Sequence, residues 1–242
     1  MLWGSEDLAP ARLLVTDRSD GASAAPYDSL NLGDHVGDDP AAVTRNRAAV
    51  AAEAAVAPDR LVFMRQTHGV RVAVVDGPPP AGRPPDADAM VTTVPGLALA
   101  VLVADCAPVL LVSSTHAVLG VAHAGRRGMV AGVVPATLAA MADAGAPVSS
   151  VHARIGPAVC GACYEVPASL QEEVAAAVPG ARARSRGGRP ALDVRAGLVD
   201  QLRSAGVASV EVDPACTAES PRLYSYRRDG VTGRFAGVAV LR

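Results

Sequence analysis

The segment from Val94 to Val112 constrains the fold more than any other part of the chain, because it is almost entirely apolar. A helix of this length would span a bilayer, but Asp105 lies inside the segment and Pro108 follows, and an unpaired carboxylate in lipid is costly. Two buried strands, Leu97 to Val103 and Val109 to Val112, joined by a tight turn, explain the same pattern. We therefore expect a β-rich core and no membrane association.

Apolar runs and helical segments alternate along the rest of the chain. Further strands are predicted at 12–16, 61–64, 70–75, 118–122, 151–155, 207–212 and 234–241, and helices at 40–57, 125–144, 167–178 and 194–205. The stretches 77–85 and 184–190 are rich in Pro and Gly and are predicted to be loops. Because strands occur in consecutive groups interrupted by helices, the pattern favours an α+β fold over a doubly wound parallel one. We expect one domain, residues 1–242, of mixed β-sheets with flanking helices.

The composition argues against some binding partners and some kinds of catalysis for this chain. Half of the 242 residues are hydrophobic but only 3% are aromatic, which predicts a core of small aliphatic side chains. The net charge of −2 does not favour nucleic acid as a partner. Every basic residue is Arg, so a lysine Schiff base or lysine base is excluded. No signal peptide is recognised, which predicts a cytoplasmic protein, with a monomer favoured, whose four cysteines are free thiols.

Three segments place a metal-binding side chain at the end of an apolar strand. They are Gln66-Thr67-His68-Gly69, Ala104-Asp105-Cys106-Ala107-Pro108 and Ala122-His123-Ala124-Gly125. Imidazole and thiolate are preferred zinc ligands, and three protein ligands leave a fourth position for water or substrate. Copper accepts the same donors. Each residue alone also has a structural explanation, as a buried thiol or a hydrogen-bonded histidine, so the spacing leaves both interpretations open.

Other polar residues carry weaker signals. Gly125 to Gly128 precede a predicted helix whose free N–H groups favour an anion, and Arg126 and Arg127 lie there. Arg47, on the first helix, is another candidate anion ligand. Cys160 and Cys163 form a C-x-x-C pair with no second pair nearby, so we expect them to bind no metal and Cys216 to belong to the core.

The order of motifs along the chain resembles the YfiH-like family, whose members were first described as polyphenol oxidases or laccase-domain proteins. The similarity extends from Asn31-Leu32-Gly33 to the C-terminal strand. Its motifs are Q-T-H-G, D-A-D-A-M-V-T-T, A-D-C-A-P-V, A-H-A-G-R-R-G, I-G-P, C-Y-E-V, C-T and Y-S-Y-R-R-D. The family usually has Trp where this chain has Arg126, which bears on substrate preference more than on the class of reaction.

The resemblance implies a site and an activity. His68, Cys106 and His123 would bind one Zn²⁺ (or Cu²⁺) and act in catalysis, and Arg47, Asn31 and Gln66 would bind substrate. The implied activity is phosphorolysis of adenosine, inosine, guanosine and methylthioadenosine, with phosphate as the second substrate and adenosine deamination as a side activity.

Three alternatives remain open at this point. The first is a hydrolase with Cys106 as nucleophile and a histidine as base, to which editing of peptidoglycan precursors would belong. The second is a copper-dependent phenol oxidase, although one His₂Cys set cannot supply the several copper centres of a multicopper oxidase. A non-enzymatic binding role is the third class, and absence of turnover on nucleosides and muropeptide precursors would favour it.

Overall fold

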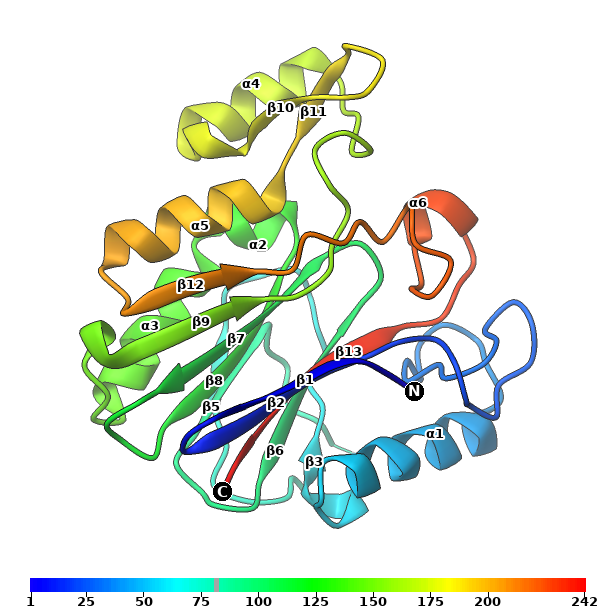
Figure 1. Ribbon diagram of the computed structural model, residues 1–242, viewed down its shortest axis with the longest axis vertical. Helices are drawn as coiled ribbons and strands as arrows, with labels where there is room; N and C mark the ends of the chain where they lie inside the picture. The colour runs from blue at the N-terminus through cyan, green and yellow to red at the C-terminus, as the bar shows by residue number, and fades with distance from the viewer. Residues whose placement is uncertain (81–82) are drawn as a thin grey trace.

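Two β-sheets pack face to face, with helices on both outer faces, in a computed structural model that describes residues 1–80 and 83–242 (Figure 1). The first sheet has the order β1 (Leu2–Leu8), β2 (Ala11–Thr16), β13 (Phe235–Leu241), β6 (Ala98–Val103) and β3 (Leu61–Val62). The second has the order β12 (Ser209–Val212), β9 (Val151–Ile155), β7 (Ala107–Ser113), β8 (Leu119–Ala124), β5 (Ala89–Thr92) and β4 (Val72–Val74). Both sheets mix parallel and antiparallel pairs, so the predicted fold class is confirmed.

The central strands are apolar on both faces because each face is covered. In β6, Ala98, Ala100 and Leu102 face the first helix, whereas Leu99 and Val101 face the second sheet. The same alternation recurs in β7 and β13. This double burial explains why the Val94–Val112 segment shows no polar periodicity.

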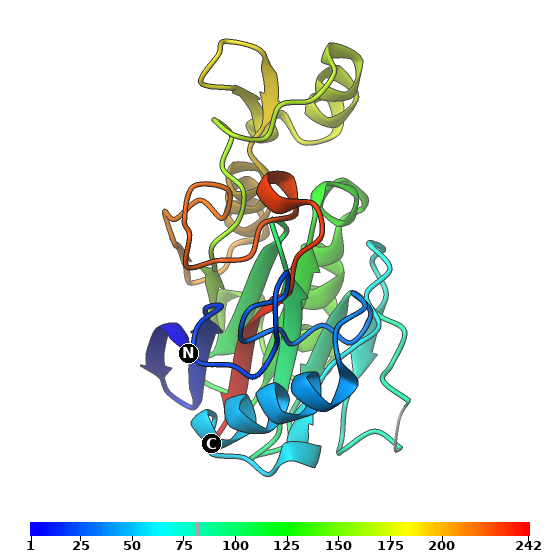
Figure 2. The ribbon, with the colours of Figure 1, turned by 90° about the vertical axis from the view of Figure 1, so that its right-hand side faces the viewer.

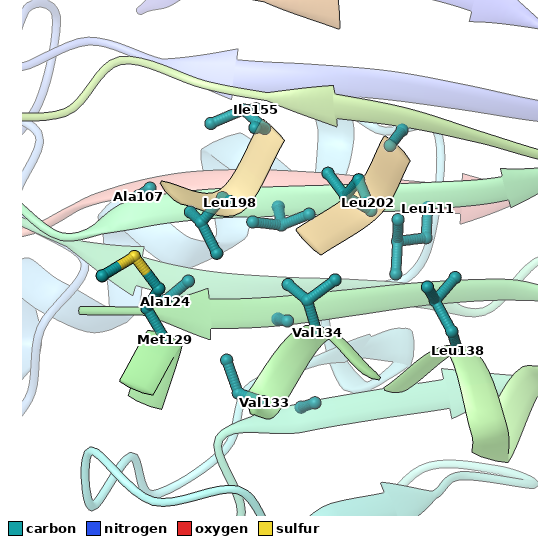
Figure 3. Close-up of a cluster of buried hydrophobic side chains, with 14 of the residues drawn as sticks. Ala107, Leu111, Ala124, Met129, Val133, Val134, Leu138, Ile155, Leu198 and Leu202 are labelled. Atoms are coloured by element: carbon teal, nitrogen blue, oxygen red, sulfur yellow. The ribbon is translucent and has the colours of Figure 1, made fainter. Parts of the chain in front are cut away.

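The outer faces are covered by helices that bury apolar stripes. Helix α1 (Pro40–Glu53) covers the first sheet, and α2 (Arg126–Ala131), α3 (Val133–Asp143) and α5 (Val194–Ala205) cover the second. Figure 3 shows Val134 and Leu138 of α3 and Leu198 and Leu202 of α5 packed over the strands of the second sheet, with Leu111 of β7 beside Leu202 and Leu138. Each of these side chains is almost completely buried, which contributes about 1.5–3 kcal/mol per large aliphatic side chain.

A smaller unit lies at one end of the molecule (Figures 1 and 2). It consists of α4 (Ala168–Ala177) and a two-stranded antiparallel sheet of β10 (Arg182–Arg184) and β11 (Pro190–Leu192). The short helix α6 (Tyr226–Asp229) and the 3₁₀ turns η1 (Pro58–Arg60), η2 (Val148–Ser150) and η3 (Pro179–Ala181) complete the elements of the described residues.

Several predicted boundaries are corrected by the structure. The helix predicted at 40–57 ends at Glu53, because Ala55 adopts a left-handed conformation with φ of 57°. The helix predicted at 125–144 is divided at Gly132, whose φ of 90° interrupts it. Strands β1 and β5 were missed: β1 lies at the edge of its sheet and its sequence is largely polar, and β5 has only four residues. Residues 81 and 82 of the predicted loop 77–85 lie outside the described residues.

Within residues 1–80 and 83–242, no helix combines the length and the apolar character that crossing a membrane requires.

A buried carboxylate anchors the N-terminal hairpin. Asp17, directly after β2, is fully buried and accepts hydrogen bonds from the Ser19 amide at 2.9 Å and hydroxyl at 2.6 Å. It also pairs with the N-terminal amine at 3.1 Å and with Arg222. Burial alone would raise the pKa of Asp17, but these hydrogen bonds outweigh it and lower the pKa to about 2.

We expect Asp17 to make folding stability depend on acidic pH. Its pKa is lower in the folded than in the unfolded chain, so its contribution is present above the unfolded pKa of about 4 and is lost as the pH falls toward 2. The contribution is about 2 kcal/mol of unfolding free energy. Urea unfolding at pH 6 and pH 3 should show a smaller loss for Asp17→Asn than for the wild type. Equal losses in both proteins would contradict this role.

Candidate metal centre and cleft

Three side chains from distant parts of the chain converge at one end of the two sheets. The donor atoms of His68, Cys106 and His123 all lie within 4.8 Å of one another. The Cys106 Sγ is 4.0 Å from the His68 Nε2, and the two imidazole rings meet edge to face with centroids 4.7 Å apart. The sequence prediction that the three metal-capable segments meet thus agrees with the structure.

Strand register explains why these segments meet. In the antiparallel pair of β7 and β8, Pro108 lies opposite His123, so Cys106 at the start of β7 lies beside the end of β8. In the pair of β5 and β8, Ala89 lies opposite Ala122, and the His123 amide donates to the Asp88 carbonyl at 2.7 Å. The loop that carries His68 connects β3 to β4 and passes over the same strand ends.

The Cys106 segment crosses from one sheet to the other, because β6 and β7 are consecutive in sequence but belong to different sheets. Asp105 turns the chain there with a positive φ of 92°. Its carboxylate accepts hydrogen bonds from the Thr217 hydroxyl at 2.6 Å, the Ser225 hydroxyl at 2.7 Å and the Arg227 amide at 2.6 Å. The C-terminal segment, residues 217–227, therefore holds Asp105 in its left-handed conformation, which costs about 1–3 kcal/mol.

Asp88 organises the two histidines, and the sequence analysis gave it no role. Its buried carboxylate accepts the amides of Thr67, His68 and Gly69 at 2.7–3.2 Å, and the Thr67 hydroxyl at 2.8 Å. These bonds hold His68 at a positive φ of 61°. The His123 Nδ1 lies 2.9 Å from the same carboxylate, which fixes its proton there and leaves Nε2 for a ligand. The signal in the sequence was a carboxylate directly before an apolar strand.

The charges within the cluster favour a thiolate. Burial raises the pKa of Cys106, but His123 and His68 outweigh that effect and lower it to about 6. Burial lowers the pKa of His123, but Asp88 and Cys106 outweigh it and raise it to about 9. Burial likewise raises the pKa of Asp88, whereas His123 and the Gly69 and Thr67 donors hold it well below its usual value. A divalent cation bound at the His123 Nε2 would replace the proton on that nitrogen, while the proton on Nδ1 stays with Asp88.

Gly125 keeps the cluster accessible. A Cβ atom at this position would lie 2.7 Å from the Cys106 Sγ, closer than such atoms approach, and 3.3 Å from the His68 Cδ2, which is a tight contact. His123 is buried, Cys106 is half-buried and His68 is exposed. The donor set of two imidazoles and one thiolate, arranged around an open side, fits a metal ion with one exchangeable position. These three residues can hold a metal, and their donors do not fix which one.

The cluster lies in a cleft of about 1150 Å³ that both sheets and the C-terminal segment border. The predicted ligand Arg47 lines it, with its guanidinium 4.1 Å from the Phe63 ring centroid and 3.2 Å from the Asp34 carboxylate. Burial lowers the pKa of Arg47, and Asp34 partly offsets that effect. Asp34 already partners this guanidinium, whose Nε donates to the Leu32 carbonyl at 2.9 Å, so an anionic ligand at Arg47 would share the cation with Asp34.

Two predicted substrate ligands use their polar groups within the protein. Gln66 borders the cleft, but its amide donates to the Leu102 carbonyl at 2.7 Å and accepts the Leu102 amide at 2.8 Å. Asn31 is fully buried and does not line the cleft. It accepts the amides of Gly33 at 2.9 Å and Arg234 at 2.8 Å. Gln66 is thus part of the cleft wall and Asn31 lies outside it, and the polar groups of both residues are bonded to neighbouring residues of the protein.

Other arginines reach the cleft without having been predicted as substrate ligands. Arg234 precedes β13, and Arg227 lies in α6 with its guanidinium 4.9 Å from the Tyr164 ring centroid; both line the cleft together with Arg126. Burial lowers the pKa of Arg234, an effect that Cys106 and Asp105 oppose. The sequence could not single out Arg234, because strand register places it: Phe235 pairs with Val103, which puts Arg234 beside the Ala104–Cys106 crossing.

Comparisons with known proteins show which family the chain is similar to. A family model described as multi-copper polyphenol oxidoreductase laccase matches residues 12–242. A protein of Streptomyces coelicolor named purine nucleoside phosphorylase is 55% identical over 237 residues, which cover 98% of each chain. A protein of Mycobacterium tuberculosis with the same name is 49% identical over 227 residues, or 94% of this chain and 90% of that protein.

Solved structures show the same fold. A Neisseria meningitidis protein superposes with a TM-score of 0.88 at 35% identity, covering 98% of each chain. YlmD from Geobacillus stearothermophilus superposes with a TM-score of 0.88 at 31% identity, covering 97% of this chain and 93% of that one. The chain therefore belongs to the laccase-domain family that includes the YfiH-like proteins, as its motifs indicated.

We expect Asp88→Asn to weaken metal binding at the cluster by about tenfold to a hundredfold, as loss of a partner that orients a ligand does. The asparagine amide would present donors to the His123 Nδ1 and to the loop amides, which themselves donate. Titration of metal-free protein with Zn²⁺ measures the effect. Asp86→Asn is the matched control, because Asp86 lies two residues away at the surface and pairs with Arg65. Similar affinities for both variants would show that Asp88 does not orient the ligands.

Proposed function

We propose that this protein is a zinc-dependent purine nucleoside phosphorylase. The observation that carries the proposal is the combination of an accessible His₂Cys cluster with half-buried arginines in one cleft of about 1150 Å³. Relatives about 50% identical over nearly the whole chain are named purine nucleoside phosphorylase, which supports the same class of reaction. The substrates are then small molecules, a nucleoside and phosphate.

The arginines supply an anion site for phosphate. Arg47 and Arg234 are partly buried, and burial lowers the pKa of each guanidinium. The Arg234 Nη1 donates to the carbonyls of Thr232 and Gly233 at 2.9 Å, which orients the guanidinium. A phosphate dianion between such groups forms charge-assisted, bidentate hydrogen bonds and offsets the cost of burying them. In this proposal Asn31 acts by holding the Arg234 backbone.

The remaining walls suit a purine nucleoside. Only seven residues of the chain are aromatic, and three of them, Phe63, Tyr164 and Tyr226, line the cleft. An aromatic face is a platform on which a purine base stacks. Gln66 connects the His68 loop to β6, because its side-chain amide donates to the Leu102 carbonyl at 2.7 Å and accepts the Leu102 amide at 2.8 Å. In this proposal these bonds fix the position of the metal cluster relative to the aromatic side chains.

Phosphorolysis breaks the bond between the base nitrogen and ribose C1′ while a phosphate oxygen bonds to C1′. A Zn²⁺ on His68, Cys106 and His123 would supply Lewis-acid stabilisation of charge that develops on the substrate. The chain's own residues hold phosphate near the ribose through the arginines, orient the base and keep His123 in one tautomer through Asp88. Holding two reactants in line contributes to the rate by removing their relative freedom.

We further propose adenosine, inosine, guanosine and methylthioadenosine as substrates, with deamination of adenosine as a side reaction. Deamination uses water as the nucleophile, so it needs the metal cluster but no phosphate site. Arg126 lies next to the cluster where the family usually has Trp, which adds a cation to the cleft wall and bears on the order of preference among these nucleosides.

One alternative retains physical support. Cys106, with a pKa lowered to about 6 and a histidine nitrogen 4.0 Å from its sulfur, resembles an activated nucleophile of the Cys-His hydrolase type, including an editing enzyme for peptidoglycan precursors. A thiolate bound to metal is a poor nucleophile, so metal content separates the two functions. A phenol oxidase would instead require copper in the cluster, and intense blue absorption on Cu²⁺ loading is its signature.

We expect the purified protein to contain zinc and to release adenine and hypoxanthine from adenosine and inosine only when phosphate is present. Cys106→Ala should abolish base release and adenosine deamination together, because both use the cluster. Metal analysis combined with chromatographic detection of base and ribose 1-phosphate measures this. Base release from metal-free protein, or hydrolysis that does not depend on phosphate, would refute the proposal.

We expect Arg47→Ala to impair only the phosphate-dependent reaction. Loss of a charge-assisted hydrogen bond costs about 1.5–3 kcal/mol, so we expect phosphorolysis at low phosphate to fall about tenfold to a hundredfold while deamination is retained. Steady-state kinetics of both reactions give the comparison. Arg45→Ala is the matched control, since Arg45 lies on the same helix but its side chain is 61% exposed and pairs with Asp39 at 4.0 Å. Equal losses of both activities for Arg47→Ala would show that it supports the site as a whole.

A further inference from the structure

A second group of sulfur ligands lies outside the cleft cluster. Cys160, Cys163, Cys216 and Glu219 each contribute a donor atom, and these atoms all lie within 4.8 Å of one another. Cys216 is buried and the other two cysteines are half-buried, and all three are free thiols. Neither the metal centre nor the substrate cleft described above uses them. We call these four residues the thiol cluster.

The local backbone gathers the thiols. Cys160 and Cys163 lie in one tight turn, in which the amides of Cys163 and Tyr164 both donate to the Cys160 carbonyl at 3.0 Å. A parallel bridge between Ala158 and Cys216 brings the third thiol to that turn, and the Thr217 amide donates to the Ala158 carbonyl at 3.2 Å. The Cys160 amide in turn lies 3.4 Å from the Cys216 Sγ, as a donor to that sulfur.

Glu219 follows Cys216 in a second turn. Its amide donates to the Cys216 carbonyl at 3.2 Å, which folds its carboxylate back toward the thiols. Arg186 pairs with that carboxylate, and the Arg228 guanidinium donates to the carbonyls of Thr217 and Ser220 at 3.0 and 2.7 Å. Two arginines therefore surround a group that becomes strongly negative when its thiols ionise.

Without a cation the thiols oppose one another's ionisation. Burial, together with Cys160 and Cys216, raises the pKa of Cys163 to about 12, and burial together with Cys216 raises the pKa of Cys160. The amide of Ala162 acts in the opposite direction on Cys160, as a donor to its sulfur. Without a cation this environment therefore keeps the thiols protonated, and a bound metal ion would offset the burial and the mutual repulsion of the thiolates.

We propose that Cys160, Cys163 and Cys216 bind a second zinc ion, with Glu219 as the fourth ligand. Three sulfurs and one carboxylate make a closed tetrahedral set for a soft-ligand divalent cation, and the C-x-x-C spacing is the usual spacing of such ligands. Zn–S bonds of about 2.3 Å require sulfurs about 3.8 Å apart, so only a small contraction from the present separation is needed. The closed set marks the ion as structural.

The position of the thiol cluster gives the ion a role. Val159, next to Cys160, donates its amide to the Asp105 carbonyl at 3.0 Å, and Thr217, next to Cys216, donates its hydroxyl to the Asp105 carboxylate at 2.6 Å. Tyr164, next to Cys163, packs against Arg227 in the cleft wall. A metal here would clamp the turn and the C-terminal segment together behind the Cys106 crossing.

The sequence prediction that the C-x-x-C pair binds no metal rested on the absence of a further ligand nearby in sequence. The structure supplies that ligand, because the bridge to Ala158 brings Cys216 from far along the chain. The expectation that Cys216 is buried holds, but a core position does not prevent its sulfur from facing the pair.

Zinc content of purified full-length variants tests the proposal. We expect two zinc ions per wild-type chain, with one lost in Cys163→Ser and the other lost in Cys106→Ser. Loss of a single ion in Cys163→Ser, with the Cys106 site still loaded, distinguishes this inference from the proposed function. A wild-type chain that holds one zinc, retained by Cys163→Ser and lost by Cys106→Ser, would overturn it.

A second measurement does not depend on how Cys163→Ser folds. Cys106→Ser, stripped of metal and titrated with Co²⁺, should develop thiolate-to-cobalt charge-transfer absorption from the thiol cluster, and Zn²⁺ should bleach it. Absence of that absorption would contradict the site. Thiol titration of denatured wild type with chelator should detect all four cysteines. Two missing thiols, restored only by reductant, would identify a disulfide in place of the metal site.

Discussion

The buried carboxylate of Asp88 is the interaction on which the rest of the candidate metal centre depends. It accepts three consecutive loop amides, a hydroxyl and the His123 imidazole, so one side chain fixes both histidine ligands. A fully buried anion is tolerated only when its oxygens are hydrogen-bonded throughout, and here they are. The left-handed His68 and the tautomer of His123 both follow from that one requirement.

The crossing at Ala104–Cys106 joins this centre to the fold. Since β6 and β7 lie in different sheets, the chain must turn sharply between them, and Asp105 makes the turn with a positive φ. Its carbonyl and carboxylate bind the segments that begin at Val159 and Thr217. Asp105 therefore connects the backbone next to Cys106 with the segments that carry Cys160 and Cys216.

The positive charge in the cleft comes from arginine side chains. All basic residues of the chain are arginines, which keep their charge when partly buried and present planar, bidentate donors. Arg47, Arg227 and Arg234 come from a helix near the N-terminus and from two C-terminal segments. All three line the cleft that also holds His68, Cys106 and His123, and this shared position is the basis for the proposal that the cleft binds phosphate.

The sequence by itself determined the apolar strands, the mixed sheets with flanking helices and the three candidate ligands, because double burial and strand-end motifs leave local patterns. It also indicated the family, through motifs spread along the chain. Only the tertiary structure decided the role of Asp88, the arginines around the cleft, the supporting positions of Asn31 and Gln66, and the meeting of Cys216 with Cys160 and Cys163. The physical reason is that strand register and sheet crossings bring together residues far apart in sequence, and no local pattern records which distant residue a buried side chain will meet.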